Sequence, residues 1–139
     1  MSSAVKSIRV DPETASDIER LSIGQRTTFS ALAAEMLCEA TKTRRCPGVV
    51  FADGPAGRRA RIEGTGIEIW EMISSYLAVG KDERRLREAY HWLSERQILA
   101  ALGYGRRYPG EIDDLIRRNN AQEPAGRDEQ LPFARRLAR

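Results

Sequence analysis

Few side chains in this sequence belong to the types that carry out catalysis or bind metals. It contains one histidine, His91, and two cysteines, Cys38 and Cys46. His91 stands between Tyr90 and Trp92, so we interpret it as a turn histidine packed among aromatic rings rather than as a general base. A zinc site needs more ligands of these kinds than the chain offers. We therefore expect no catalytic residue, no metal, no cofactor and no enzymatic activity.

Structural roles explain the other reactive or aromatic side chains. Cys38 falls within a predicted helix, where a small buried side chain is expected. Trp70 and Trp92 are expected in the core because the chain has few large apolar residues. The acidic and basic residues of 111–117 stand at helical spacing, which favours local ion pairs over catalysis.

Side chains that could bind DNA occur near the N-terminus. Residues 5–10 are rich in β-branched types and predict a short strand. In a strand, Ile8 and Val10 would face one side, and three residues would face the other: Val5, Ser7 and Arg9. On a DNA-facing side, Arg9 could bind a guanine edge and Ser7 could bond to either base type.

Two helices are predicted to follow this strand. Asp11 and Pro12 suit the start of a helix that ends at Gly24. Thr27 or Thr28 could cap a second helix over about 29–41, and the free amides there could hold a phosphate. The expected buried face of that helix is Phe29, Leu32, Ala33, Met36, Leu37 and Ala40.

Strand, short helix, glycine turn and longer helix form the pattern of a ribbon-helix-helix module, which we assign to residues 1–45. One strand and two helices bury too little alone, so two chains must pair their strands in a homodimer or higher oligomer. The resulting ribbon is narrow enough for a major groove. In the alternative, these elements pack on the next domain and Arg9 is merely solvated.

The middle of the chain, residues 46–120, predicts a small β region followed by helices. Strands are expected at 49–51 and 58–62, with a turn at 53–57 and a third short strand at 67–69. Helices are expected over about 70–79, 82–90, 94–104 and 111–118. A tight turn before the third of these is typical of a helix-turn-helix, and Arg96 and Gln97 would be its secondary DNA-binding pair.

Composition and charge limit the remaining classes. The chain has 139 residues, a net charge of +3 and 31% charged residues, which is a balance typical of globular domains. No apolar run is long enough to span a membrane, so we expect a cytoplasmic protein. Residues 121–139 contain two prolines and one glycine and have few apolar residues. This composition predicts a flexible tail.

Several motifs in the middle of the chain resemble the domain-of-unknown-function family 433. They are the stretch Arg61-Ile62-Glu63-Gly64-Thr65-Gly66-Ile67-Glu68-Ile69-Trp70, then Tyr76-Leu77-Ala78-Val79-Gly80, and Ile98-Leu99-Ala100-Ala101-Leu102-Gly103-Tyr104. The resemblance covers about residues 46–118 and implies a homeodomain-like arrangement of helices. It departs from the family at Gly66, where relatives usually have arginine.

Many members of that family are VapB-type antitoxins of bacterial toxin–antitoxin pairs, and relatives are often encoded beside a PIN-like ribonuclease. The resemblance therefore implies an antitoxin that binds a PIN-like ribonuclease toxin and its own operator DNA. The tail combines apolar and basic side chains suited to a partner, and the expected toxin-binding residues are Phe133, Arg135, Arg136, Leu137 and Arg139. A stand-alone transcriptional regulator without a toxin is the alternative.

Overall fold

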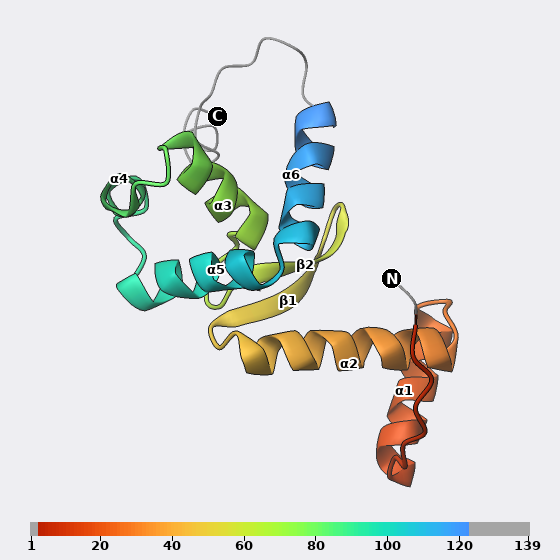
Figure 1. Cartoon of the computed structure of the whole chain (residues 1–139). Helices are drawn as coiled ribbons and strands as arrows, with labels where there is room; N and C mark the ends of the chain where they lie inside the picture. The colour runs from red at the N-terminus through yellow and green to blue at the C-terminus, as the bar shows by residue number, and fades with distance from the viewer. Residues whose placement is uncertain (1–2, 123–139) are drawn as a thin grey trace. The chain divides into compact units, whose positions relative to one another are not determined.

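The computed structural model describes residues 3–122 and is mainly helical, with six helices and one small antiparallel sheet in that range (Figure 1). The chain divides into two compact units, one up to Thr41 and one from Lys42 onward. The predicted fold class, mainly α with short β elements, is confirmed at this level.

Local capping sets the helices of the first unit. Helix α1 spans Pro12–Gly24, and the Asp11 side chain accepts a hydrogen bond from the Thr14 amide at 3.0 Å. This bond holds the pKa of the exposed Asp11 carboxyl below its usual range. Helix α2 spans Phe29–Arg45, and its cap is the Thr28 hydroxyl, which accepts from the Ala31 amide at 3.1 Å. It ends beyond the predicted position because three basic side chains in its last turn stabilise the negative end of the helix dipole.

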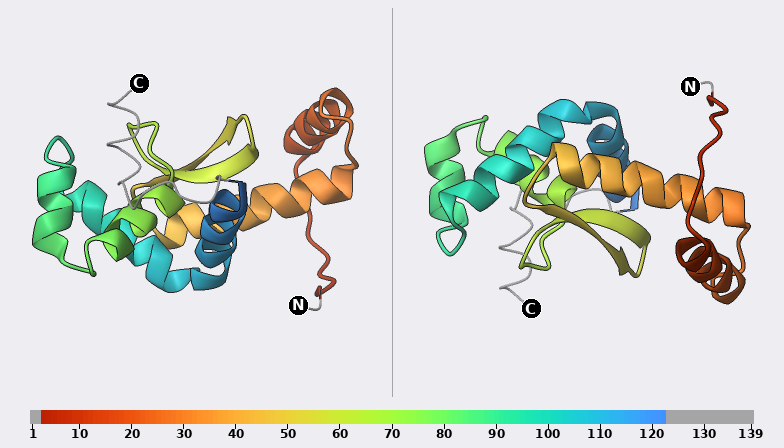
Figure 2. Two further views of the ribbon diagram at one scale, coloured as in Figure 1. Left: turned by 90° about the horizontal axis from the view of Figure 1, so that it is seen from above. Right: turned by 90° about the horizontal axis from the view of Figure 1, so that it is seen from below.

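The predicted strand at residues 5–10 is not a strand within one chain. Residues 3–11 form no regular element, and Figures 1 and 2 show an extended trace there with no strand beside it. The physical reason is that strand amides and carbonyls need the backbone of a neighbouring strand. No other segment of residues 3–41 supplies one.

The second unit begins with a β-hairpin. Strand β1 spans Val49–Gly54 and pairs antiparallel with β2, Gly57–Ile62, in a register from Val49 opposite Ile62 to Gly54 opposite Gly57. Both predicted strands and their turn are thus confirmed. The predicted third strand at 67–69 is wrong, because only one bridge forms, between Arg61 and Glu68. Helix formation from Ile69 onward removes the rest of that strand.

Four helices follow the hairpin (Figure 2). They are α3 Ile69–Ala78, α4 Glu83–Ala89, α5 Glu95–Arg107 and α6 Pro109–Gln122. Helix α3 contacts β2, α4, α5 and α6, so it occupies the centre of this unit. Helix α6 is longer than predicted at both ends. Pro109 starts it because proline fits the first turn, where its missing amide costs nothing.

A single buried cluster fills the second unit and includes Val49, Ile62, Met72, Leu86 and Leu102. Trp70 is buried as expected, whereas Trp92 is 51% exposed. Trp92 lies in the turn between α4 and α5, where Tyr90 fills the buried position instead. Cys38 is exposed, contrary to the expectation, because it lies on an outward face of α2.

Two glycines of α5 give a matched test of how closely α5 and α3 approach. A Cβ at Gly105 would lie 2.6 Å from Ile73 Cδ1 and 2.9 Å from Ile73 Cγ1, whereas one at Gly103 would meet nothing within 4 Å. Gly103→Ala should therefore stabilise the fold by up to about 1 kcal/mol through helix propensity. Gly105→Ala should destabilise it by roughly 1–3 kcal/mol through overpacking. Urea unfolding measures both, and equal effects would contradict this packing.

Candidate nucleic-acid interface

The N-terminal residues predicted to read DNA are all accessible. Val5, Ser7 and Arg9 are exposed, with Val5 at 95%. Arg9 forms no ion pair with any residue that the structure describes. On the other side of the segment, Ile8 is 64% exposed and Val10 is half-buried. The segment therefore presents both its polar and its apolar side chains to solvent in a single chain.

Apolar side chains of the two N-terminal helices are also exposed. Within residues 3–41, Leu32 is the only buried apolar side chain. Of the predicted buried face of α2, Phe29, Leu37 and Ala40 are exposed, Ala33 and Met36 are half-buried, and Leu32 alone is buried. The large apolar residues exposed in this unit are Val5, Ile8, Leu21, Ile23, Phe29 and Leu37. This unit therefore has enough apolar side chains to form a core, but most of them are exposed to solvent.

The start of α2 is the predicted phosphate contact. Thr28 uses its hydroxyl for the cap, and the Thr27 amide donates to the Ser22 carbonyl at 2.9 Å. Both threonines are exposed. The first amides of α2 donate no hydrogen bond within the helix and point outward along its axis, as at any helix N-terminus. The geometry thus leaves part of this helix end available to an anion.

Helices α3, α4 and α5 follow one another with short turns, and α5 carries the predicted secondary pair. Arg96 is exposed and forms no ion pair within the described chain. Gln97 instead completes a capping box, because its Oε1 accepts from the Ser94 amide at 2.8 Å. Its Nε2 donates to the Glu63 carbonyl at 3.4 Å. Gln97 therefore holds the start of α5, and Arg96 is the available side chain of the pair.

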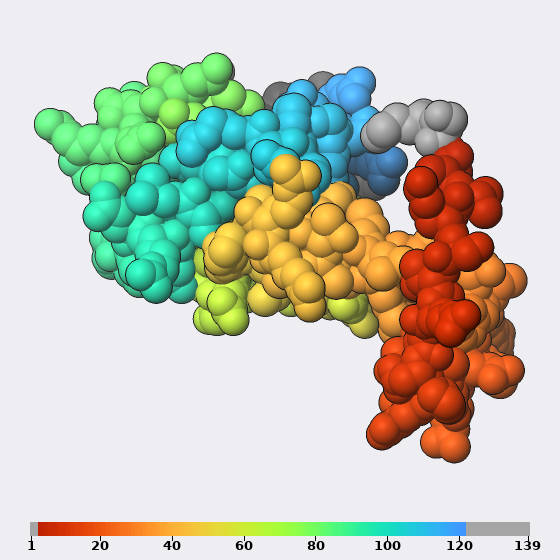
Figure 3. Space-filling model, turned by 60° about the horizontal axis from the view of Figure 1, so that its bottom comes forward, coloured from red at the N-terminus to blue at the C-terminus, as the bar shows by residue number. Residues whose placement is uncertain are grey.

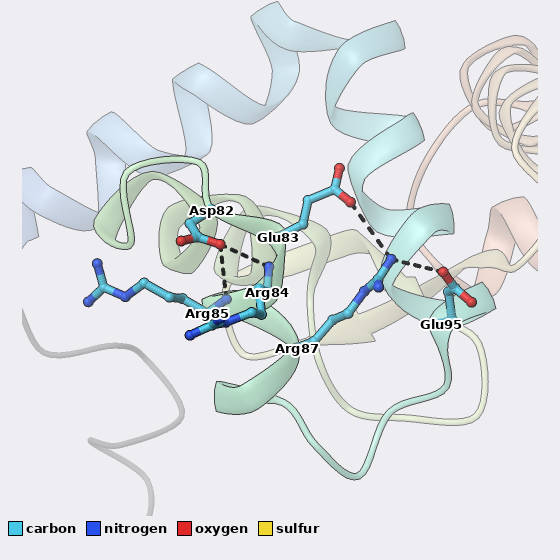
Figure 4. Close-up of polar contacts among 6 residues, drawn as sticks. All are labelled: Asp82, Glu83, Arg84, Arg85, Arg87 and Glu95. Carbon is cyan, nitrogen blue, oxygen red and sulfur yellow. Dashed lines mark hydrogen bonds and ion pairs between the residues drawn. The ribbon is translucent and has the colours of Figure 1, made fainter.

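A charge clamp that the sequence analysis missed joins α4 to α5 (Figure 4). Arg87 Nη2 lies 2.9 Å from Glu95 Oε1 and 3.7 Å from Glu83 Oε2. The clamp offsets the negative charge of Glu95 at the exposed start of α5. The contact between Arg87 and Glu83 has the spacing of a helical pair and could have been predicted. The contact with Glu95 depends on the turn between the helices.

Comparison with known proteins identifies part of this region. Residues 49–105 match the family model described as "Protein of unknown function (DUF433)". The match runs from the first residue of β1 into α5 and lies within the range where the sequence resembles that family. No curated protein and no solved structure matches the chain. The family description assigns no activity.

A polar network links Tyr104, inside the DUF433 segment, to residues on both sides of that segment. Lys42 Nζ lies 2.5 Å from Glu111 Oε1 and 4.9 Å from the centre of the Tyr108 ring. The Tyr104 hydroxyl donates a hydrogen bond to Glu111 Oε2. Burial, together with the Glu111 carboxylate, raises the pKa of Tyr104 far above its usual value. Tyr104 is thus a neutral donor that fixes Glu111, and the network has a structural role.

Within the DUF433 segment, Tyr90 and Ser75 form a second buried polar contact. Their hydroxyl oxygens lie 2.8 Å apart, and burial raises the pKa of Tyr90. His91 is exposed and meets the edge of Trp92, as expected for a turn histidine. Among the described residues, no cluster of histidine, cysteine and acidic side chains could hold a metal ion. None of the described helices is both long and apolar enough to cross a membrane.

The five tail residues predicted to bind a toxin lie outside the described residues: Phe133, Arg135, Arg136, Leu137 and Arg139. Helix α6 reaches Gln122, so the predicted tail boundary at residue 121 lies inside a helix. A truncation that keeps the described helix α6 intact therefore removes residues 123–139.

Proposed function

We propose that this protein is a dimeric DNA-binding antitoxin. The observation that carries the dimer and its DNA surface is the shortage of buried apolar side chains in residues 3–41, where Leu32 is the only apolar side chain that is buried. A unit of this kind gains stability when a second copy covers its apolar side chains. The antitoxin role draws on the match to the DUF433 family and on the composition of the tail.

In the proposed dimer, residues 5–10 of two chains pair as antiparallel strands. Pairing satisfies the backbone hydrogen bonds that one chain leaves open. Ile8 and Val10 then face the paired helices, where exposed Leu37 and Phe29 offer apolar partners. This arrangement is the ribbon-helix-helix module, and it accounts for both the exposed segment and the incompletely buried helices.

The opposite side of the ribbon is the proposed DNA-reading surface. Arg9 is exposed and free of ion pairs within the described chain, so no competing carboxylate would have to be displaced. Ser7 and Val5 share its side of the strand by alternation. The first turn of α2, beside Thr27 and Thr28, supplies backbone amides for a phosphate, whereas the Thr27 amide itself stays bonded to the Ser22 carbonyl. Direct base contacts would come from the ribbon, and the helix end would set its position.

The second unit contributes more weakly to DNA binding in this proposal. Helices α3 to α5 have the order of a homeodomain-like helix-turn-helix, and α5 lies at the surface of this unit (Figure 3). Arg96 is its available contact, and the clamp by Arg87 reduces repulsion from Glu95. Helix α5 has only scattered basic residues, so we assign it a secondary role in DNA binding.

The proposed toxin is a PIN-like ribonuclease with an acidic metal site. An arginine among Arg135, Arg136 and Arg139 would enter that acidic site, and Phe133 and Leu137 would fill apolar grooves beside it. A stand-alone regulator without a toxin remains the second candidate function. Because both candidates share the dimer and its DNA surface, they differ only in whether the chain forms a stable complex with another protein.

The ribbon is tested by two single variants, each of which places one negative charge on a different face of the strand. Ile8→Asp should convert the dimer to a monomer, since it buries a carboxylate in the proposed apolar interface. Val5→Asp is the matched control: it should keep the dimer but weaken DNA binding, because its charge faces the phosphates. Sedimentation velocity and binding to a duplex from upstream of the gene measure the two effects. A monomeric parent protein, or a dimer that survives Ile8→Asp, would rule out the ribbon.

The antitoxin role is tested by removing residues 123–139. The shortened chain should keep its DNA affinity but lose the ability to neutralise the product of a neighbouring ribonuclease gene during co-expression. The control is an equally long tail with the five named residues replaced by serine, which separates composition from length. Full neutralisation by the shortened chain would disprove the tail assignment. Absence of any complex with the full chain would favour the stand-alone regulator.

A further inference from the structure

Two arginines lie side by side on the hairpin face that points away from the buried cluster. Arg59 and Arg61 alternate along β2 with the buried Ala60 and Ile62, so both arginines project from the opposite face. Both are half-buried, and the side chain of Arg59 is 18% exposed. Two guanidinium groups on one partly buried face repel each other unless acceptors or anions surround them.

The hydrogen-bond acceptors around these arginines are too few. Each guanidinium carries five N–H donors. Arg61 Nη2 donates to the Asp53 carbonyl at 3.1 Å, but Arg61 Nε is buried with no partner. Arg59 Nη1 lies 3.8 Å from Glu68 Oε2, which is too long for a hydrogen bond. That same oxygen accepts from Trp70 Nε1 at 2.6 Å. Glu68 therefore accepts a hydrogen bond from the indole and forms only a long ion pair with Arg59.

The charges at this face leave a net positive site. Of the carboxylates at this hairpin, Glu68 pairs with Arg59 at 3.8 Å, whereas the Asp53 carboxylate pairs with Arg58 at 3.4 Å. Two positive charges therefore face one negative charge. Leaving N–H donors of a partly buried guanidinium without acceptors costs free energy, which an incoming anion would recover.

Gly54 makes room for the arginine head group. A Cβ at Gly54 would lie 3.0 Å from Arg61 Nη2 and 4.0 Å from Glu68 Oε1. The guanidinium thus rests against the glycine at the end of β1 and is held near the turn instead of extending into solvent. Held in this way, Arg61 loses little further conformational entropy when it binds a ligand.

We propose that Arg59 and Arg61 form a binding site for one phosphate group. A phosphate has enough oxygens to accept from both guanidinium groups at once, and the fork of arginine matches its geometry. The phosphate belongs either to a DNA backbone or to a free phosphorylated ligand. The site stands on contacts within the second unit, so it does not depend on the proposed ribbon or on the antitoxin role.

The full-length protein should be titrated with inorganic phosphate at constant ionic strength, with chloride as the exchanged ion. Arginine Nε–H resonances are the readout, since the buried Nε of Arg61 exchanges its proton slowly. We expect saturable shifts at Arg59 and Arg61 and none at Arg84, whose Nε pairs with Glu88 at 3.4 Å. Shifts that grow linearly, or that occur equally at Arg84, would overturn the site.

Four variants distinguish a binding site from a structural ion pair. Arg59→Gln and Arg61→Gln should each weaken phosphate binding about tenfold or more, the usual effect of losing a charge-assisted hydrogen bond. Glu68→Gln should strengthen it, because the competing carboxylate is removed while the amide oxygen still accepts from Trp70. Gly54→Ala should weaken it by displacing Arg61. A purely structural ion pair predicts no gain in affinity from Glu68→Gln, and that result would refute the proposal.

Matched controls exclude effects of folding and of total charge. Gly66→Ala is the control for Gly54→Ala, since a Cβ there would meet nothing within 4 Å. Arg84→Gln removes the same charge elsewhere in the second unit. Both controls should leave phosphate binding unchanged, and each variant should retain the amide spectrum of the folded parent. Equal losses in the controls would contradict a localised site.

A short DNA duplex separates the two sources of phosphate. If the duplex shifts the same two resonances and inorganic phosphate competes with it, the site binds the DNA backbone. If phosphate binds but the duplex leaves both resonances unchanged, the site serves a free phosphorylated ligand. Both outcomes support the site, whereas absence of saturable binding by phosphate and by duplex refutes it. The Ile8→Asp variant should bind inorganic phosphate normally. A failure of the proposed ribbon can therefore be distinguished from a failure of the phosphate site.

Discussion

The two units of this chain differ in how many of their apolar side chains are buried. The second unit has a continuous core of strand, helix and loop residues, and its stability follows from that burial. The first unit has two well-capped helices but one buried apolar residue, Leu32. Capping and helix propensity alone rarely hold short helices together in water. A second copy of the chain would supply the missing apolar contacts, and the proposed DNA surface depends on that pairing.

The second unit owes its geometry to polar contacts at the ends of its helices. Asp82 caps α4, and Ser94 with Gln97 caps α5. Arg87 joins the two helices through Glu95. These contacts are exposed, so each contributes modestly to stability. Their main effect is to fix the angle at which α5 is presented. The core and these contacts together hold the surface side chains of the unit, including the arginine pair on its hairpin.

Features set by neighbouring residues were predictable from the sequence. Asp11 before Pro12, and Ser94 three residues before Gln97, marked the starts of α1 and α5 because caps act over three residues. The hairpin was likewise predictable from its turn. Such signals need no knowledge of the rest of the fold.

Features set by distant contacts were not predictable. Ile69 joins a helix instead of a third strand because α3 packs against β2, α5 and α6. Trp92 is exposed because Tyr90 takes the buried place beside Ser75. In the same way, the contacts of Arg61 with Asp53 and of Arg87 with Glu95 cross turns. Alternation placed Arg59 and Arg61 on one face, but it could not reveal that their acceptors are too few.

Amide hydrogen exchange at two protein concentrations tests the central claim most directly. If residues 12–41 depend on a second chain for their core, their protection should increase strongly with protein concentration, as expected when folding is linked to association. Protection of residues 49–105 should stay constant, because their core lies within one chain. Strong protection of residues 12–41 that does not change with dilution to a monomer would contradict the account.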